Sequence, residues 1–310
     1  MAVLFRSSSS DSAERWREAL AREMPELEFR VWPEIGDPAE IEFALVWRPQ
    51  PGLLASLPNL RLIASLGAGV DHILADPDLP RHVPLVRLVD PYMTVAMSEY
   101  VLMQVLRLHR QEPEYAMQQR AGIWRELPQP NASERCVGIL GLGELGRDAA
   151  VKLRALGFDV AGWSRTPKSV EGVASFHGAD GLAPFLARSE ILVCLLPLTP
   201  ETENILNRET FARLPRGAAL VNAARGRHLA EADLIPALGS GQLSWAVLDV
   251  FRDEPLPAGH PFWRHERILI TPHAAAITNP PTAARVVADN FRRCREGRPL
   301  LNVVEYDVGY

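Results

Sequence analysis

The sequence predicts an α/β protein built from two doubly wound parallel-sheet domains. Short, continuous apolar runs alternate with helix-like segments, and this alternation occurs in two successive series. Continuously apolar strands are typical of parallel sheets whose two faces are both covered by helices. The chain has 310 residues, more than one hydrophobic core usually organises, so two domains are expected.

The first series of elements opens the chain. A helix is expected over residues 12–24, with Ser10 or Asp11 as its N-cap. One long helix is expected over residues 97–119, kinked at Pro113 because proline removes a helical hydrogen bond. Strands are expected at residues 2–5, 43–47, 60–65 and 85–89.

The second series contains six more apolar runs. Strands are expected at residues 137–140, 158–163, 191–195, 219–222, 245–250 and 268–270. The last helix-like stretch, residues 281–296, follows the completed series and is expected to return to the first domain. We therefore predict one domain from residues 1–98 and 282–310, and another from residues 99–281.

Composition and charge exclude several classes of function. The net charge of -5 and the pI near 5.9 argue against a nucleic-acid binder. The longest apolar run, residues 191–198, is too short to span a bilayer, and no secretory signal is visible. The three cysteines form no CxxC pair, so neither a metal site nor a disulfide framework is predicted. A reducing, cytoplasmic location is the default expectation.

A glycine-rich motif predicts a dinucleotide site in the second domain. Gly141, Gly143 and Gly146 have the spacing G-x-G-x-x-G, between an apolar strand and a helix-like run. The first glycine permits a tight turn, the second lets the backbone approach a pyrophosphate, and the third lets helix and strand pack closely. The amino end of the helix then presents free N–H groups to the phosphates.

The residues after the next strand predict which dinucleotide binds. An enzyme that uses NAD usually has an acid there, which binds the ribose 2′-hydroxyl. This chain has Ser164, Arg165, Thr166 and Lys168 instead. Arg165 would attract a 2′-phosphate, and Ser164 and Thr166 could donate hydrogen bonds to it. The turn favours NADP(H), with NAD(H) as the second choice, although a solvated basic turn would have the same composition.

Three polar residues follow strands of the second series. Arg225 follows the strand at 219–222, Glu254 follows the strand at 245–250, and His273 follows the strand at 268–270. Residues beyond the carboxyl ends of parallel strands face the ligand crevice. An arginine, an acid and a histidine in that position are suited to binding an anion and transferring a proton. The other histidines, including His72, are interpreted as structural or surface residues.

Together these motifs resemble the D-isomer-specific 2-hydroxyacid dehydrogenases. The resemblance covers nearly the whole chain, and its most specific segments are residues 67–71, the glycine motif, and residues 195–202, 222–226 and 248–273. Residues 44–48, 163–166 and the Gly309-Tyr310 end favour the glyoxylate/hydroxypyruvate reductase A branch. The resemblance implies a Rossmann cofactor domain, a flavodoxin-like substrate domain and a cleft between them.

The family implies a role for each polar residue. Arg225 would bind the substrate carboxylate and polarise the 2-oxo group, and the backbone of Ala68 and Gly69 would hold the other side of that carboxylate. His273 would donate a proton to the carbonyl oxygen as hydride arrives, and Glu254 would orient its ring and favour its protonated form. Further cofactor contacts are implied for Glu144, Leu145, Leu196, Pro197, Thr202, Ala223, Arg225, Asp249, His273 and Ala275.

The substrate is expected to be a small 2-oxo acid. Trp47 and Arg48 are candidate substrate contacts at the end of a first-domain strand, and Gly67, Met93 and Trp245 are further candidate walls. Glyoxylate and hydroxypyruvate are favoured by resemblance. Trp245 and the three alanines after His273 depart from the wider family, and this leaves the identity of the substrate open.

Alternative functions have different sequence signatures. A non-catalytic protein that senses NADP(H) would not need the full set of Arg225, Glu254 and His273. A formate dehydrogenase of this fold carries Gln where Glu254 stands, and a phosphoglycerate type usually has an acid at the position of Ser164. The resemblance also implies a homodimer formed through the cofactor domain.

Overall fold

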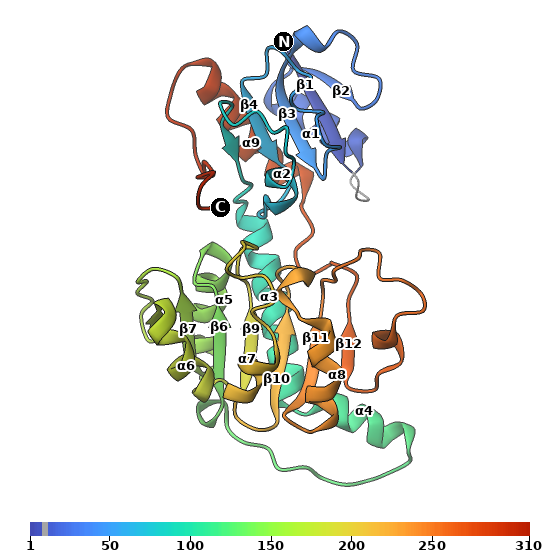
Figure 1. Cartoon of the computed structure of the whole chain (residues 1–310), viewed down its shortest axis with the longest axis vertical. Coiled ribbons are helices and arrows are strands. Elements are labelled where there is room, and N and C mark those ends of the chain that lie inside the picture. Colours follow the sequence, from blue (N-terminus) through green and yellow to red (C-terminus); the bar gives the residue numbers. More distant parts are fainter. Residues whose placement is uncertain (8–11) are drawn as a thin grey trace. The chain divides into compact units, whose positions relative to one another are not determined.

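The computed structural model describes residues 1–7 and 12–310 and divides the chain into two compact units. Unit 1 comprises residues 1–93 and 278–310, and unit 2 comprises residues 94–277 (Figure 1). Both crossings therefore come a few residues earlier than the sequence suggested. The expected N-caps Ser10 and Asp11 lie outside the described residues, and helix α1 (Ala13–Glu23) is capped by Ser12, whose Oγ accepts a hydrogen bond from Arg15 N.

Unit 1 is a five-stranded parallel sheet covered by helices. The strand order β2-β1-β3-β4-β5 is the flavodoxin-like order, as expected. Its strands are β1 (Ala2–Ser7), β2 (Glu28–Val31), β3 (Ile41–Trp47), β4 (Leu62–Ser65) and β5 (Leu85–Val86). A short 3-10 turn, η1 (Pro38–Glu40), precedes β3, and α2 (Asp71–Leu74) follows the loop after β4.

The carboxyl-terminal helix belongs to the core of unit 1. Helix α9 (Pro280–Arg295) packs against α1 and against strand β4 (Figure 1). Phe291 of α9 stacks on Phe43 of β3 with ring centroids 4.4 Å apart. Two segments from opposite ends of the chain thus form one hydrophobic core, and the expected return of the last helix to the first domain agrees with this arrangement.

Unit 2 is a seven-stranded parallel sheet with the Rossmann strand order. The order β12-β11-β10-β9-β6-β7-β8 reverses direction beside β6, which is where such sheets bind ligands. Its strands are β6 (Cys136–Leu140), β7 (Asp159–Ser164), β8 (Ala174–His177), β9 (Ile191–Cys194), β10 (Ala218–Asn222), β11 (Leu243–Leu248) and β12 (Ile268–Ile270). The predicted fold class is confirmed.

The helices of unit 2 correct one prediction. Residues 97–119 do not form one kinked helix, because α3 (Pro91–His109) ends before α4 (Glu112–Arg120) begins. Gln111 between them has a left-handed φ of 56°, and Pro113 lies in the first turn of α4, where its missing N–H costs nothing. The remaining elements are η2 (Ala132–Glu134), α5 (Glu144–Ala155), α6 (Gly178–Arg188), α7 (Arg208–Arg213), η3 (Gly226–His228), α8 (Glu231–Gly239) and η4 (Pro261–Arg264).

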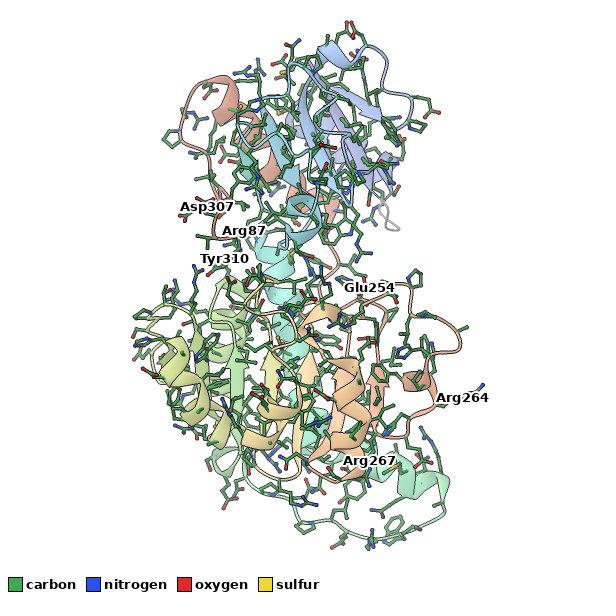
Figure 2. All side chains as sticks on the ribbon, in the orientation of Figure 1. Arg87, Glu254, Arg264, Arg267, Asp307 and Tyr310 are labelled. Atoms are coloured by element: carbon green, nitrogen blue, oxygen red, sulfur yellow. The ribbon has the colours of Figure 1, made fainter. Side chains whose placement is uncertain are left out.

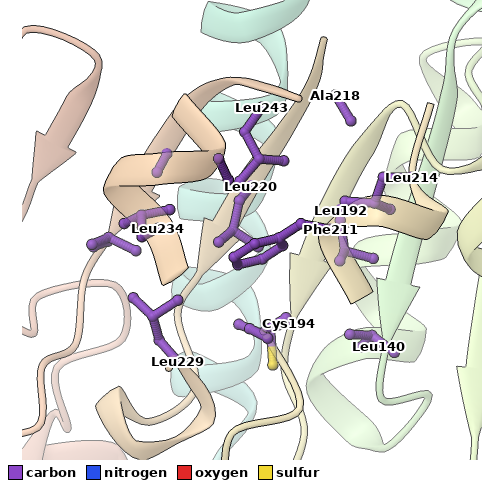
Figure 3. Close-up of a cluster of buried hydrophobic side chains, with 14 of the residues drawn as sticks. Leu140, Leu192, Cys194, Phe211, Leu214, Ala218, Leu220, Leu229, Leu234 and Leu243 are labelled. Atoms are coloured by element: carbon purple, nitrogen blue, oxygen red, sulfur yellow. The ribbon is translucent and has the colours of Figure 1, made fainter. Parts of the chain in front are cut away.

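The core of unit 2 has two layers, one on each face of the sheet. Along β9, Leu192 and Cys194 point to one face, while Ile191 and Val193 point to the other. Figure 3 shows the first layer, where Leu192, Leu220 and Phe211 pack together. All central strands are buried on both faces, which explains why the sequence revealed them as continuous apolar runs.

Two strands were not predicted from the sequence because they are not buried on both faces. β2 and β8 lie at sheet edges and are partly exposed, so neither has a continuous apolar run. In the part of the chain that the structure describes, no helix is both long enough and apolar enough to cross a bilayer.

Candidate active site

The three candidate catalytic residues follow three neighbouring strands of unit 2. Arg225 comes after β10, Glu254 after β11 and His273 after β12, and these strands pair in parallel. Their carboxyl ends therefore meet at one edge of the sheet. Figure 2 shows Glu254 at that edge, whereas Arg267, which precedes β12, lies at the opposite end. This edge is where α/β sheets bind their ligands.

His273 and Glu254 form a direct pair. His273 Nδ1 lies 2.9 Å from Glu254 Oε2, and the other carboxylate oxygen, Oε1, accepts a hydrogen bond from Phe251 N at 3.1 Å. An ionised carboxylate can only accept, so Nδ1 carries the hydrogen in this bond. The second ring nitrogen, Nε2, is then the one that can hold a transferable proton. About a third of the His273 side chain is exposed, which leaves the ring accessible to a ligand.

Arg225 lies on a turn that touches the Glu254 loop. Gly226 packs so closely against that loop that a Cβ atom would lie 1.8 Å from the Phe251 carbonyl carbon. Asn222, which is fully buried, holds the turn itself. Its Oδ1 accepts from Ala224 N at 3.2 Å, and its Nδ2 donates to Arg225 O at 3.0 Å. The sequence did not single out Asn222, although a buried amide beside a catalytic candidate is a signal for this role.

Asp249 holds the loop that carries His273. Its Oδ1 accepts from Ala274 N at 2.9 Å and its Oδ2 accepts from Ala275 N at 3.0 Å. Its main-chain oxygen accepts from His273 N at 2.8 Å. The carboxylate is buried, and His273 has a left-handed φ of 54°. A non-glycine residue rarely adopts this conformation unless its surroundings fix it. A cofactor contact of Asp249, implied by the family resemblance, stays a prediction.

Two hydroxyl groups extend this network to helix α3. Thr271 Oγ1 donates to Asp249 Oδ1 at 2.5 Å and lies 2.7 Å from the Tyr100 hydroxyl. Because the Thr271 hydrogen points to the carboxylate, Tyr100 is the donor in the second bond. Burial is the main cause that raises the pKa of Tyr100 to about 12, so its hydroxyl keeps its hydrogen at neutral pH.

The predicted dinucleotide site has the geometry that such a ligand needs. Gly141 has a φ of 105°, and a Cβ on Gly146 would lie 1.8 Å from Gly141 O, so α5 and the turn can meet only through glycine. A Cβ on Gly143, by contrast, would enter open space beside the amino end of α5. A pyrophosphate needs that space to reach the N–H groups of the helix. The residues therefore fit a dinucleotide.

The basic turn after β7 is open to solvent. Arg165, Thr166 and Lys168 are exposed. Ser164 Oγ donates to Thr166 O at 2.8 Å, so its hydrogen is used within the turn, and it would have to exchange partners to bind a phosphate as predicted. A hydrogen bond from Thr199 lowers the pKa of Glu201, and its own backbone and the charge of Arg165 add to this effect. Arg165 is thus close to the predicted cofactor loop around Pro197 and Thr202.

The predicted substrate contacts of unit 1 lie near each other within that unit. Trp47 ends strand β3, and its indole ring lies 4.2 Å from the His72 ring. Gly67 leaves room for this indole, because a Cβ there would come within 2.5 Å of it. Ser65 Oγ accepts from Gly67 N and donates to Gly69 O, both at 3.2 Å, which shapes the loop containing Ala68. Arg48 is exposed.

Trp245 is not a pocket wall as proposed from the sequence. It lies near the start of β11, away from the carboxyl end of that strand, and it is buried in the core layer beside α3 and α5. Its indole N–H donates to Glu114 of α4. A large residue next to a motif was mistaken for a ligand contact because the sequence does not show which end of the strand it occupies. Among the described residues, no group of three potential ligands that could hold a metal ion is found.

Comparison with known proteins decides the family. The family model described as "D-isomer specific 2-hydroxyacid dehydrogenase, NAD binding domain" matches residues 102–275. A glyoxylate/hydroxypyruvate reductase A from Serratia proteamaculans (strain 568) is 46% identical over 304 residues, which cover 96% of this chain and 97% of the relative. The chain belongs to the D-isomer specific 2-hydroxyacid dehydrogenase family. The resemblance inferred from the motifs is confirmed.

Solved structures of the 2-hydroxyacid dehydrogenase family share the whole fold. One from Xanthobacter autotrophicus Py2, in complex with NADPH and MES, has a TM-score of 0.95 and 48% identity and covers 99% of both chains. An NADPH-dependent glyoxylate/hydroxypyruvate reductase from Sinorhizobium meliloti, in complex with NADP and sulfate, has a TM-score of 0.93 and 41% identity. It covers 100% of this chain and 99% of its own.

The network around Asp249 is testable without cofactor or substrate. Asp249→Asn places a donor where a buried N–H already points, so we expect it to lower the free energy of unfolding of the free protein by about 1–3 kcal/mol. Tyr100→Phe removes one hydrogen bond and should cost about 0.5–1.5 kcal/mol. Urea unfolding followed by fluorescence measures both.

The matched control is Asp253→Asn, which changes an exposed acid on the same segment and should leave stability unchanged. If Asp249→Asn weakened only NADPH binding and left the free protein as stable as the wild type, Asp249 would serve only as the predicted cofactor contact and would not support the His273 loop.

Proposed function

We propose that this 2-hydroxyacid dehydrogenase uses NADPH to reduce a small 2-oxo acid, glyoxylate or hydroxypyruvate, to the 2-hydroxy acid. The observation that carries this proposal is the pairing of His273 with Glu254 at 2.9 Å, at the same edge of the sheet as Arg225 and the glycine-rich turn. The relatives named glyoxylate/hydroxypyruvate reductase A support the choice of substrate.

Each residue has one task in the proposed reaction. When bound, the reduced nicotinamide supplies the hydride that is added to the 2-oxo carbon. Arg225 binds the substrate carboxylate and draws electron density toward the 2-oxo oxygen. His273 donates its Nε2 proton to that oxygen, so that a neutral alcohol forms and the imidazole becomes neutral. Glu254 keeps its charge and holds Nδ1–H throughout. The positive charge of Arg225 compensates locally for the negative charge of the whole chain.

Each unit is assigned its own part of the proposed binding. The backbone of Ala68 and Gly69 binds the far side of the substrate carboxylate, and Trp47 and Arg48 limit the size of the acid. Gly141, Gly143 and Gly146, with Glu144 and Leu145, hold the pyrophosphate. The other predicted contacts, Leu196, Pro197, Thr202, Ala223, Asp249 and Ala275, hold the nicotinamide and its ribose. Residues 1–93 and 278–310 thus serve the substrate, and residues 94–277 serve the cofactor.

The reaction is tested with a panel of 2-oxo acids and both cofactors. We expect NADPH oxidation with glyoxylate or hydroxypyruvate, and we expect His273→Ala to lower kcat by about 100- to 10,000-fold, the usual contribution of general acid catalysis. NADPH binding, followed by fluorescence, should survive this substitution. The control His82→Ala, an exposed histidine of unit 1, should keep wild-type turnover.

Two results would count against the proposal. Near-normal turnover of His273→Ala would remove His273 from the mechanism. NADPH binding without turnover of any acid in the panel would favour the alternative of a non-catalytic, NADP(H)-sensing protein of the same fold.

The cofactor preference is tested at Arg165. A charge-assisted hydrogen bond contributes about 1.5–3 kcal/mol, so we expect Arg165→Ala to raise the KM for NADPH roughly tenfold to a hundredfold and to leave the KM for NADH nearly unchanged. Arg213→Ala, another exposed arginine of unit 2, is the control. An equal loss for both cofactors would mean that Arg165 does not contact the 2′-phosphate.

We also propose a homodimer formed through unit 2, and a cytoplasmic location. The dimer is supported by exposed apolar side chains on α3, α4 and the segment that follows, namely Met103, Leu106, Tyr115, Ile123 and Trp124, of which Trp124 is 97% exposed. The location is supported by three free cysteines. Light scattering should give twice the chain mass for the wild type and a lower average mass for Trp124→Ser. A monomeric wild type would refute the dimer.

A further inference from the structure

A fully buried histidine that the proposed mechanism does not use lies beside Arg225. His228 is the last residue of turn η3, three positions after Arg225, and none of its surface is exposed. Its Nε2 lies 3.2 Å from Pro197 O, and its Nδ1 lies 3.2 Å from Arg225 N. One imidazole ring thus bridges the turn that carries Arg225 and the loop predicted to contact the cofactor.

The surroundings fix which ring nitrogen carries hydrogen. Pro197 O can only accept, so Nε2 is the donor in that bond. Nδ1 also lies 3.2 Å from Arg225 O, but that oxygen already accepts from Asn222 Nδ2 at 3.0 Å and from His228 N at 3.2 Å. Its two lone pairs are therefore used. Nδ1 remains as the acceptor for Arg225 N–H.

The loop is joined to the turn at both of its ends. At the first end, Pro197 O accepts from His228 Nε2 and also from Thr202 Oγ1 at 2.8 Å. At the second end, Asn204 N donates to Arg227 O and Leu206 N donates to His228 O, both at 2.9 Å. The main chain makes this second junction together with an ion pair, in which Arg227 Nη2 donates to Glu203 Oε2 at 2.9 Å. The His228 side chain makes the first junction, through Pro197 O.

We propose that His228 is a positioning residue that holds Arg225 at a fixed spacing from the cofactor loop. This inference rests on the proposed function, because it assumes that Arg225 binds the acid and that the Pro197–Thr202 loop binds NADPH. Nδ1 fixes the backbone of Arg225, and therefore the place of the substrate carboxylate. Nε2 fixes the main chain of the loop at Pro197. Nδ1 therefore affects substrate binding, and Nε2 affects cofactor binding.

Two substitutions separate these bonds. Asparagine places an oxygen acceptor near the position of Nδ1 and has nothing at the position of Nε2, whereas glutamine places an amide donor near the position of Nε2. His228→Asn should therefore raise the Kd for NADPH about 5- to 30-fold, the factor for losing about 1–2 kcal/mol, and keep the KM for glyoxylate at saturating NADPH within about twofold. His228→Gln should raise the KM for glyoxylate by a similar factor and keep the Kd for NADPH.

The Kd is measured by NADPH fluorescence without any acid present, so it does not depend on turnover. The inference would be overturned if His228→Asn changed only the KM for glyoxylate and His228→Gln changed only the Kd for NADPH. It would also be overturned if both constants changed equally in both variants, or if neither constant changed. A merely structural histidine would change both constants together, because both variants would loosen the same core.

A measurement on the wild-type protein avoids variants that do not fold. Nitrogen NMR of the ¹⁵N-histidine-labelled protein should give His228 as the neutral form with hydrogen on Nε2. Hydrogen on Nδ1, or on both nitrogens, at neutral pH would overturn the inference. If no acid in the panel is reduced, the proposed function fails, while the NMR signal and the NADPH Kd still decide the role of His228.

Discussion

The proposed chemistry depends on one hydrogen bond, from His273 Nδ1 to Glu254 Oε2 at 2.9 Å. It decides which nitrogen of the ring can give a proton away. Without the carboxylate, either tautomer of a neutral imidazole could form, and the ring could rotate about its χ angles. Because Glu254 is itself held through Phe251 N, the bond connects the ring to the backbone after β11. The positions of strands β11 and β12, which Glu254 and His273 follow, therefore determine that Nε2 is the nitrogen that donates the proton.

Holding His273 in this orientation has a cost in free energy that the surrounding loops offset. A left-handed non-glycine residue costs on the order of 1–3 kcal/mol. The buried carboxylate of Asp249 offsets this through hydrogen bonds to the two residues after His273, and its main chain binds His273 itself. On the other side, Gly226 lets the Arg225 turn lie directly on the Phe251 carbonyl. The active-site edge of unit 2 is thus a set of loops that fix one another.

The sequence predicted what depends on local pattern. The central strands are buried on both faces, so each is a continuous apolar run, and Arg225, Glu254 and His273 follow such runs directly. Edge strands β2 and β8 have no such run, and a single left-handed residue, Gln111, was enough to divide a helix that looked continuous. These errors arise where burial or one backbone angle, rather than periodicity, determines the structure.

The residues that support the site were harder to predict because their roles depend on contacts that are distant in sequence. Asp249 acts on residues 25 and 26 positions later, and His228 reaches Pro197 across 31 positions. Trp245 belongs to the same class, since its burial in a core layer and its bond to Glu114 of α4 are visible only in the structure. A sequence shows which residue types are present, but the structure is needed to show which of them meet.

The most direct measurement is a crystal structure of the protein with NADP⁺ and oxamate, an unreactive analogue of a 2-oxo acid. We predict that His273 Nε2 lies within hydrogen-bond distance of the oxamate amide oxygen, while Nδ1 stays bonded to Glu254. We also predict that the oxamate carboxylate contacts Arg225. An imidazole turned away from the analogue, or separated from Glu254 in the complex, would contradict the proposed role of His273.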